Sequence, residues 1–382
     1  MSASKAPTVL FLGAGASAPL DFPVTKQVMA EIGLEPANAT KLEEVTEHSE
    51  LLTKIYGQLP PDKRDLEGIL DFLRIANNEM SSYQLDVLKD KMQAQSPTDF
   101  RATIGDIVTK HEEELKELED DIKAHMFNLY VFQPEKHGGK AEEIYKPLIN
   151  LLLADRIFDE DVEELPIFTT NYDLVIENVI DRRFMRNFDF VDGFQLEGRR
   201  GEKVFSLAEY EKSREKTTIK LFKLHGGLNW WNRKIDNRIV AWPDIINLKG
   251  NPNYDATPWI IYPAGYGPYP RDEFHVLHDY LEKYLANAKR CIVIGYTFRD
   301  IGRASHIFDD VMRDLNKELE VIISDVKGSI NELKEVKNLF GKYEGKYEYH
   351  GGGIEALPQH LKEKTAAKKP SPKVDVTPKE PT

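Results

Sequence analysis

Glycines with the spacing of a phosphate-binding turn follow the first apolar run of the chain. Gly13, Gly15 and Ala18 match the pattern G-x-G-x-x-G/A directly after the run from Val9 to Leu12. Glycine has no Cβ, so the backbone N–H groups of such a turn can approach a pyrophosphate closely. The spacing predicts a phosphate-binding turn, although a tight strand-to-helix turn without a ligand would have a similar sequence.

Two features depart from the turn of a dinucleotide-binding dehydrogenase. Pro19 and Pro23 delay the following helix, which lengthens the turn into a loop. The acidic residue that usually ends a second strand about 20 positions later is missing, because that region has a helical pattern. A dinucleotide bound here would need another part of the chain to hold its adenosine end.

Polar residues also follow later apolar runs, where ligands bind in an open parallel sheet. The residues at these ends are Thr169, Thr170, Asn171, Tyr172 and Asp173; His225; Gly295, Tyr296 and Thr297; Ser324 and Asp325. Taken alone, Asp173 could cap a helix, Asn171 could satisfy turn backbone, and His225 could be a structural histidine. Their shared position at strand ends predicts that they form one site.

The apolar runs that must position these residues alternate with helical patterns. Strands are expected at 9–12, 165–170, 218–226, 257–263, 290–296 and 320–325, and helices at 24–32, 173–184 and 302–319. This alternation predicts a parallel sheet with right-handed crossovers. The expected fold class is therefore α/β, a Rossmann-like doubly wound parallel sheet with an inserted α-helical module.

The inserted module is expected at 37–162, where no strand pattern occurs. Apolar residues recur at helical spacing in 65–76, 103–130 and 141–155, and Pro147 is expected to kink or delay the last helix. The α/β domain then consists of 1–36 and 163–361. The remainder, 362–382, holds six Lys, three acidic residues and four Pro, which predicts a disordered tail.

Composition excludes several classes of protein. The net charge of −13 argues against direct nucleic-acid binding. No apolar stretch approaches the roughly 20 residues that span a bilayer, and no signal-peptide pattern is present, so we expect a cytoplasmic protein that does not bind membranes. The single cysteine, Cys291, excludes an intrachain disulfide and a multi-cysteine zinc site. We expect no metal, and the run "HEEELKELEDD" is typical of a solvated helix face.

Four motifs in order, "GAGAS", "TTNYD", "KLHGGLNW" and "IVIGYTFRD", resemble the sirtuin-like proteins of bacteria and archaea, in the branch associated with defence against phage. The resemblance covers the expected α/β domain and leaves out the helical module and the tail. It implies that NAD binds as a substrate.

The resemblance also implies roles for individual residues. Asn171 would orient the nicotinamide ribose and a reacting water, Asp173 would shape the nicotinamide pocket, and His225, with a pKa near neutrality, would be the general base. The phosphates would contact Gly13, Ala14, Gly15, Ala16 and Ser17. The other implied NAD-binding residues are Thr170, Gly295, Tyr296, Thr297, Ser324 and Asp325.

Two departures from the classical sirtuin deacetylases favour hydrolysis of NAD. Those enzymes carry a four-cysteine zinc module, which one Cys cannot build, and an acidic-aromatic-arginine segment, where this chain has "DFPVT". The expected function is an NAD glycohydrolase that depletes NAD as the effector of an anti-phage defence system. The alternatives are a sensor or scaffold subunit that binds NAD or ADP-ribose without turnover, and a protein deacylase or ADP-ribosyltransferase.

An enzyme that destroys NAD must be restrained, and the resemblance implies restraint by assembly. We expect a homo-oligomer or a separate trigger protein, such as a hexameric HerA-like ATPase or an Argonaute-like protein. The chain has no Walker-type phosphate loop and no nucleic-acid-binding motif, so a sensor would be another chain. The helical module is the expected docking or oligomerisation surface.

Overall fold

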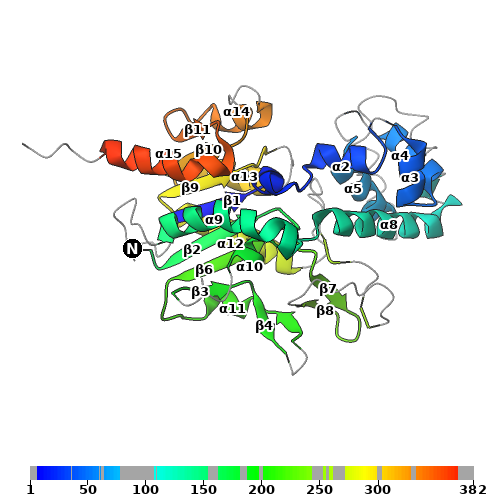
Figure 1. The fold of residues 1–382 in the computed structure, drawn as a ribbon, viewed down its shortest axis with the longest axis horizontal. Coiled ribbons are helices and arrows are strands. Elements are labelled where there is room, and N and C mark those ends of the chain that lie inside the picture. Colours follow the sequence, from blue (N-terminus) through cyan, green and yellow to red (C-terminus); the bar gives the residue numbers. More distant parts are fainter. Residues whose placement is uncertain are drawn as a thin grey trace, which may run out of the picture.

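The computed structural model describes residues 7–35, 37–59, 61, 64–77, 107–108, 110–153, 162–180, 187–197, 201–242, 253–254, 258–260, 272–298, 303–327 and 333–368. A seven-stranded sheet in the order β11-β10-β9-β1-β2-β6-β3 crosses this part of the chain, and its strands pair in parallel (Figure 1). The strands are β1 (Thr8–Leu12), β2 (Glu164–Thr169), β3 (Asp189–Val191), β6 (Thr218–Lys223), β9 (Arg290–Ile294), β10 (Glu320–Ser324) and β11 (Tyr347–His350). The expected α/β class with a parallel sheet is confirmed.

Helices cover both faces of this sheet, which explains why its central strands are apolar without alternation. Successive residues of a strand point to opposite faces, so Phe11 packs in a core with α12, α13 and α14, while Leu10 packs in a core with α9, α10 and α15. Figure 1 shows α9, α10 and α15 on one side of the sheet. The bounds of these helices are α9 (Gly139–Leu153), α10 (Val175–Val179), α12 (Asp272–Asn287), α13 (Arg303–Asp310), α14 (Lys334–Phe340) and α15 (Gly353–Lys368).

A second group of helices lies beside the sheet and encloses a core of its own (Figure 1). Met29, Leu52, Leu70 and Leu118 are buried in this core, each contributed by a different helix. The four helices, and one that packs with them, are α2 (Thr25–Glu31), α3 (Ala39–Val45), α4 (Ser49–Gln58), α5 (Leu66–Asn77) and α8 (Glu112–Tyr130). We call this group of five helices the helical module.

The limits of the helical module differ from the expected 37–162. Helix α2 precedes residue 37 but packs in the core of the module, and α9 lies inside the expected insertion but packs on the sheet. Buried Ile144, Leu148 and Leu152 of α9 recur every four residues and share a core with Leu10. The helix runs without interruption through Pro147, so the proline does not delay it.

A small antiparallel sheet in the order β4-β5-β8-β7 was not expected from the sequence. Its strands are only three or four residues long, too short to show periodicity: β4 (Phe194–Leu196), β5 (Lys203–Phe205), β7 (Trp230–Arg233) and β8 (Arg238–Ala241). Trp231 is buried against this sheet, whereas Trp230 belongs to the core under the parallel sheet.

The expected strand at 257–263 is wrong for the part that the structure describes. Within 258–260, Ile260 forms one isolated antiparallel bridge with Gly226, and the Trp259 N–H donates to the Trp230 carbonyl at 2.6 Å. The segment is therefore tied to the chain that follows β6 and does not extend the parallel sheet.

The C-terminal helix passes the expected start of the tail at Lys362. Helix α15 continues to Lys368, and within it Lys364 forms ion pairs with Glu320 at 2.6 Å and with Glu348 on the sheet. The rest of the expected tail, 369–382, lies outside the described residues. Short elements complete the description: α1 (Ala14–Ser17), η1 (Ala18–Leu20), η3 (Pro134–Gly138), α11 (Ala208–Glu211) and η5 (Val311–Leu315).

Candidate functional site

The predicted site residues lie along one edge of the parallel sheet. Strand β1 lies between β2 and β9, which is a topological switch point, and ligands bind outside the carboxyl ends of strands at such a point. Neighbouring strand ends carry Asp325 after β10, Gly295 after β9, Gly13 after β1, Asn171 after β2 and His225 after β6.

The glycine loop packs backbone to backbone against the loop that follows β9. A Cβ on Gly13 would lie 2.6 Å from the Gly295 carbonyl oxygen, and a Cβ on Gly295, whose φ is +61°, would lie 2.3 Å from the Ala16 nitrogen. The Gly13 and Gly15 N–H groups donate to the Ile294 and Gly295 carbonyls at 2.9 Å, and Ala16 N–H donates to Gly13. The glycines thus allow the two loops to pack closely. A phosphate bound here would need hydrogen-bond donors other than the N–H groups of Gly13, Gly15 and Ala16.

Asn171 and Asp173 are joined through the hydroxyl of Ser17. The Asn171 amide nitrogen Nδ2 donates to the Gly13 carbonyl and to Ser17 Oγ, each at 3.0 Å. The Ser17 hydroxyl donates to Asp173 Oδ2 at 2.7 Å. Asp173 Oδ1 accepts the first amide of α10, from Val175, at 3.0 Å. The alternative role considered for Asn171 therefore occurs, since its side chain satisfies turn backbone. Asp173 binds the first amide of α10, although the N-cap residue of that helix is Leu174.

One face of Asn171 is left for a ligand. Its Oδ1 atom accepts no hydrogen bond from any residue that the structure describes, while its Nδ2 atom is fixed by two acceptors. The side chain is half-buried. An amide held in this way can present its oxygen to a water or a sugar hydroxyl without a loss of rotamer freedom.

Tyr145 supports the same loop from α9, and nothing in the sequence pointed to it. Its hydroxyl donates to the Ala16 carbonyl at 2.7 Å, and burial raises the pKa of Tyr145 far above its usual range. It comes from a helix assigned to the insertion, and no motif surrounds it. Thr170 is held to β1 by its N–H, which donates to the Leu12 carbonyl at 3.1 Å.

His225 is buried between two aromatic rings. Its ring centroid lies 6.5 Å from that of Tyr172 and 6.5 Å from that of His278, and the residue is 4% exposed. Burial, and to a lesser degree His278, lowers the pKa of His225 to about 3. The pKa of His225 thus lies well below the expected value near neutrality, because among the described residues no acidic side chain offsets the cost of burying an imidazolium.

His278 is a second buried histidine that the sequence analysis missed. It lies on α12, is fully buried, and its Nδ1 is 2.9 Å from the Phe274 carbonyl oxygen, one turn earlier in the helix. That bond requires a proton on Nδ1. A histidine inside an amphipathic helix gave no signal in the sequence.

The residues expected at the adenosine end of NAD have mixed positions. Ser324 is fully buried and donates to the Gly353 carbonyl at 2.9 Å, and Asp325 Oδ1 accepts the Lys327 N–H at 2.9 Å. Tyr296 is a core residue, with its ring 4.7 Å from that of Phe11. Their neighbour Thr297 is half-buried. The segments 299–302 and 328–332, which continue these strand ends, lie outside the described residues.

Phe298 shows backbone strain directly after the β9 loop. Its φ of +55° lies in the left-handed region that side chains rarely adopt. Its ring packs edge-on against Phe308 and Phe340, with centroids 5.2 Å away in each case. Such strain persists where packing over-determines it and is concentrated at functional sites.

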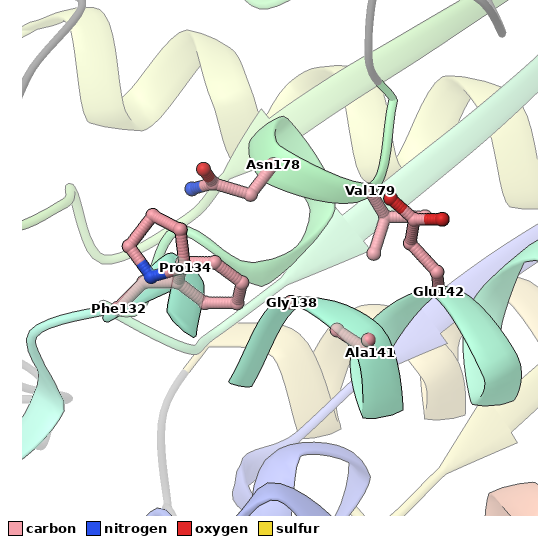
Figure 2. A pocket seen from close by; sticks show the side chains of 8 residues that line it. Phe132, Pro134, Gly138, Ala141, Glu142, Asn178 and Val179 are labelled. Carbon is pink, nitrogen blue, oxygen red and sulfur yellow. The ribbon is translucent and has the colours of Figure 1, made fainter. Parts of the chain in front are cut away.

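A cavity of about 250 Å³ lies on the α9 side of the sheet and contains none of the predicted site residues. Figure 2 shows Phe132 and Pro134 at one end of it and Glu142 and Val179 at the other. Its lining comes from η3, the start of α9 and the end of α10. The cavity is thus separate from the strand ends that carry Asn171 and His225.

Among the described residues, one group of side chains could share a metal ion. Glu47, His48 and Glu117 lie in the helical module, and His48 Nε2 is 3.0 Å from Glu117 Oε2. Both glutamates are largely exposed, and none of the three is near the strand ends. In the part of the chain that the structure describes, no helix combines the length and apolarity needed to cross a membrane.

Comparison with known proteins identifies a domain type over the middle of the chain. Residues 166–339 match the SIR2-like domain. This segment begins within β2 and includes the carboxyl ends of β2, β6, β9 and β10. It does not include the glycine loop. A solved structure of Sir2 with the inhibitor EX-527, 2′-O-acetyl-ADP-ribose and a deacetylated p53 peptide is similar over 94% of each chain, with 10% identity and a TM-score of 0.39. That similarity is too distant to add to the argument. No curated protein matches the chain in sequence.

Proposed function

We propose that the chain is an NAD glycohydrolase, which cleaves NAD to nicotinamide and ADP-ribose. The observation that carries this proposal is the position of Asn171 and His225, at the ends of the paired strands β2 and β6 beside the glycine loop. Both residues lie inside the segment that matches the SIR2-like domain. The site thus combines a nucleotide-binding edge with an oriented amide and an imidazole.

The reaction needs a held water and a route for one proton. The bond from ribose to nicotinamide breaks with its electron pair on the nicotinamide nitrogen, through an oxocarbenium-like state that water then attacks. Asn171 Oδ1 would hold the water or a ribose hydroxyl, while Gly13 and Ser17 fix the amide. His225 enters as a neutral imidazole and would accept the proton that the water loses. Asp173 acts through Ser17.

One observation favours a second candidate, a subunit that binds NAD or ADP-ribose without turnover. The pKa of His225 of about 3 makes it a weak base unless a ligand changes its surroundings. Against this candidate, a protein that only binds NAD needs neither the oriented Asn171 nor the imidazole.

The wider role that we propose rests on the motif resemblance. The protein would be the NAD-depleting effector of a prokaryotic anti-phage defence system in the cytoplasm. It would act as a homo-oligomer or with a separate trigger protein, such as a HerA-like ATPase or an Argonaute-like protein. The helical module offers the surface for such assembly. Measuring cellular NAD during phage infection, with and without the chain, would test this role, and unchanged NAD would contradict it.

The proposed activity is tested by nicotinamide release from NAD, with NAD binding followed by calorimetry in the same samples. Asn171→Ala and His225→Ala should each lower release by at least about 100-fold, the usual weight of such groups. Asn178→Ala is the matched control, because Asn178 lies on α10 at the separate cavity. It should release nicotinamide at the wild-type rate. Binding without release would indicate either the second candidate or an enzyme that awaits its trigger protein, and adding candidate partners would separate these two. The absence of both binding and release would overturn both candidates.

A further inference from the structure

A buried lysine lies beneath the loop that carries Asn171. Lys223 is the last residue of β6, two positions before His225, and its side chain is 4% exposed. Its ammonium donates to the backbone carbonyl of Asp173 through a short hydrogen bond and lies 3.1 Å from Glu177 Oε1 on α10. The Lys223 side chain thus connects β6 to the loop after β2 and to α10, the helix that follows this loop.

Stability alone gives a poor reason for this arrangement. Burying an ammonium is costly unless a counter-charge is close, and apolar residues of similar size often serve stability as well as a buried pair or better. Glu177 supplies the counter-charge, yet its Oε2 atom is buried and has no hydrogen-bond partner among the described residues. Burial raises the pKa of Glu177 against the opposing effect of Lys223. The segments that the Lys223–Glu177 pair connects therefore indicate its role better than its contribution to stability does.

The segments joined by Lys223 are those that carry the two proposed catalytic side chains. The Leu228 N–H, after the His225 turn, donates to the Tyr172 carbonyl at 3.1 Å. The turn also wraps the lysine stem, since a Cβ on Gly227 would lie 2.8 Å from Lys223 Cε. Lys223 and the Leu228 N–H therefore bind two consecutive carbonyls of the "TTNYD" loop, those of Asp173 and Tyr172. Both donors flank His225 in the sequence.

We infer that Lys223 is a positioning residue, which fixes the loop of Asn171 relative to His225, with Glu177 as its counter-charge. The effect passes from the Asp173 backbone to the Asp173 carboxylate, through Ser17 to the Asn171 amide. The role in catalysis rests on the proposed NAD hydrolysis, whereas the fastening of the loop does not.

The test uses Lys223→Met, the double variant Lys223→Met/Glu177→Met, and a matched control. Lys220→Met is that control, because Lys220 is also a buried lysine of β6, and its ammonium lies 2.8 Å from Glu164 Oε1, away from the carboxyl ends of the strands. The double variant removes both charges, so that no unpaired carboxylate is left buried. Each full-length variant is assayed for nicotinamide release, thermal unfolding, and hydrogen exchange of the Leu228 and Val175 amides.

Lys223→Met and the double variant should lower kcat for nicotinamide release by about 100-fold, as expected for a small misplacement of a catalytic group, with a smaller change in KM. The Leu228 and Val175 amides should exchange faster in both, and the double variant should recover thermal stability without recovering kcat. Lys220→Met should leave kcat and both amides unchanged.

Wild-type kcat in either Lys223 variant, or recovery of kcat in the double variant, would overturn the positioning role. If the wild-type chain releases no nicotinamide, either alone or with candidate trigger proteins, the proposed function fails, and the exchange experiment still decides whether Lys223 fastens the loop. Unchanged exchange at Leu228 and Val175 would then overturn the inference on its own.

Discussion

At the scale of single residues, His225 is an imidazole that burial keeps uncharged. It packs between Tyr172 and His278 and accepts no hydrogen bond, and donates none, among the residues that the structure describes. A neutral ring can accept a hydrogen bond from a ribose hydroxyl at any physiological pH. Its strength as a base then depends on how a bound substrate changes the pocket.

The lowered pKa of His225 predicts a pH-dependent loss of stability in weak acid. An unfolded chain binds a proton at this side chain below about pH 6.5, while the folded chain does so only near pH 3. Between these values the unfolded state gains protons that the folded state lacks, so the free energy of unfolding falls as the pH falls. The expected contribution is a loss of about 2 kcal/mol from pH 7 to pH 5.

Urea unfolding of wild type and His225→Gln at pH 7 and pH 5 checks this expectation. The variant cannot take up the proton, so its stability should decrease less over the same interval. Equal decreases in the two proteins would show that His225 titrates near neutrality in the folded state.

At the scale of elements, the β9 loop and the glycine loop form one packed unit. The unit depends on Gly295, whose positive φ and contact with Ala16 leave no room for a Cβ. Tyr145 of α9 bonds to the same loop from the other side. The shape of the proposed nucleotide-binding edge is therefore set by three segments that are distant in sequence.

Gly295→Ala should destabilise the protein by about 3 kcal/mol or more, because it adds left-handed strain to a backbone clash. Gly57→Ala is the control, since Gly57 lies in α4 with no atom within 4 Å of an added Cβ. In a helix this change should be neutral or stabilise by up to about 1 kcal/mol. Chemical unfolding of both variants gives the comparison, and equal stabilities would contradict the close packing of the two loops.

At the scale of the whole molecule, the helical module is attached to the site through apolar contacts. Its core includes Leu228 and Ile260 as well as residues of α2, α4, α5 and α8, and Tyr172 packs against it. Leu228 and Tyr172 both flank the proposed catalytic side chains. The module is therefore packed against the loops of the candidate site.

Leu118→Ala, in the core of the module, tests this coupling. The change should cost about 2–5 kcal/mol, the range for removing a buried leucine, and the loss should be felt by the whole chain. Tryptophan fluorescence reports on the α/β body, which contains Trp230 and Trp231, and far-ultraviolet circular dichroism reports on all helices. Coincident urea transitions by both probes are expected, and a separate early transition by circular dichroism alone would show an independent module.

The sequence by itself determined the sheet and the edge at which the candidate site residues meet. Strands β1, β2, β9 and β10 are mainly apolar runs because helices cover both faces, and this pattern is local enough to be recognised. Strand β6 is also buried, although Lys220 and Lys223 interrupt its apolar residues. Polar residues at the ends of those runs also lie next to each other in the chain. Their meeting at one edge follows from parallel strand order.

Only the tertiary structure decided what each of these residues contacts. The short strands of the second sheet show no periodicity. Helix α9 packs on the face of the parallel sheet because its apolar residues share a core with Leu10. Tyr145, His278 and Lys223 act on the site from other elements, and burial lowers the pKa of His225 far from its ordinary value. Burial and hydrogen-bond partners depend on segments far apart in the chain, and for that reason no local pattern encodes them.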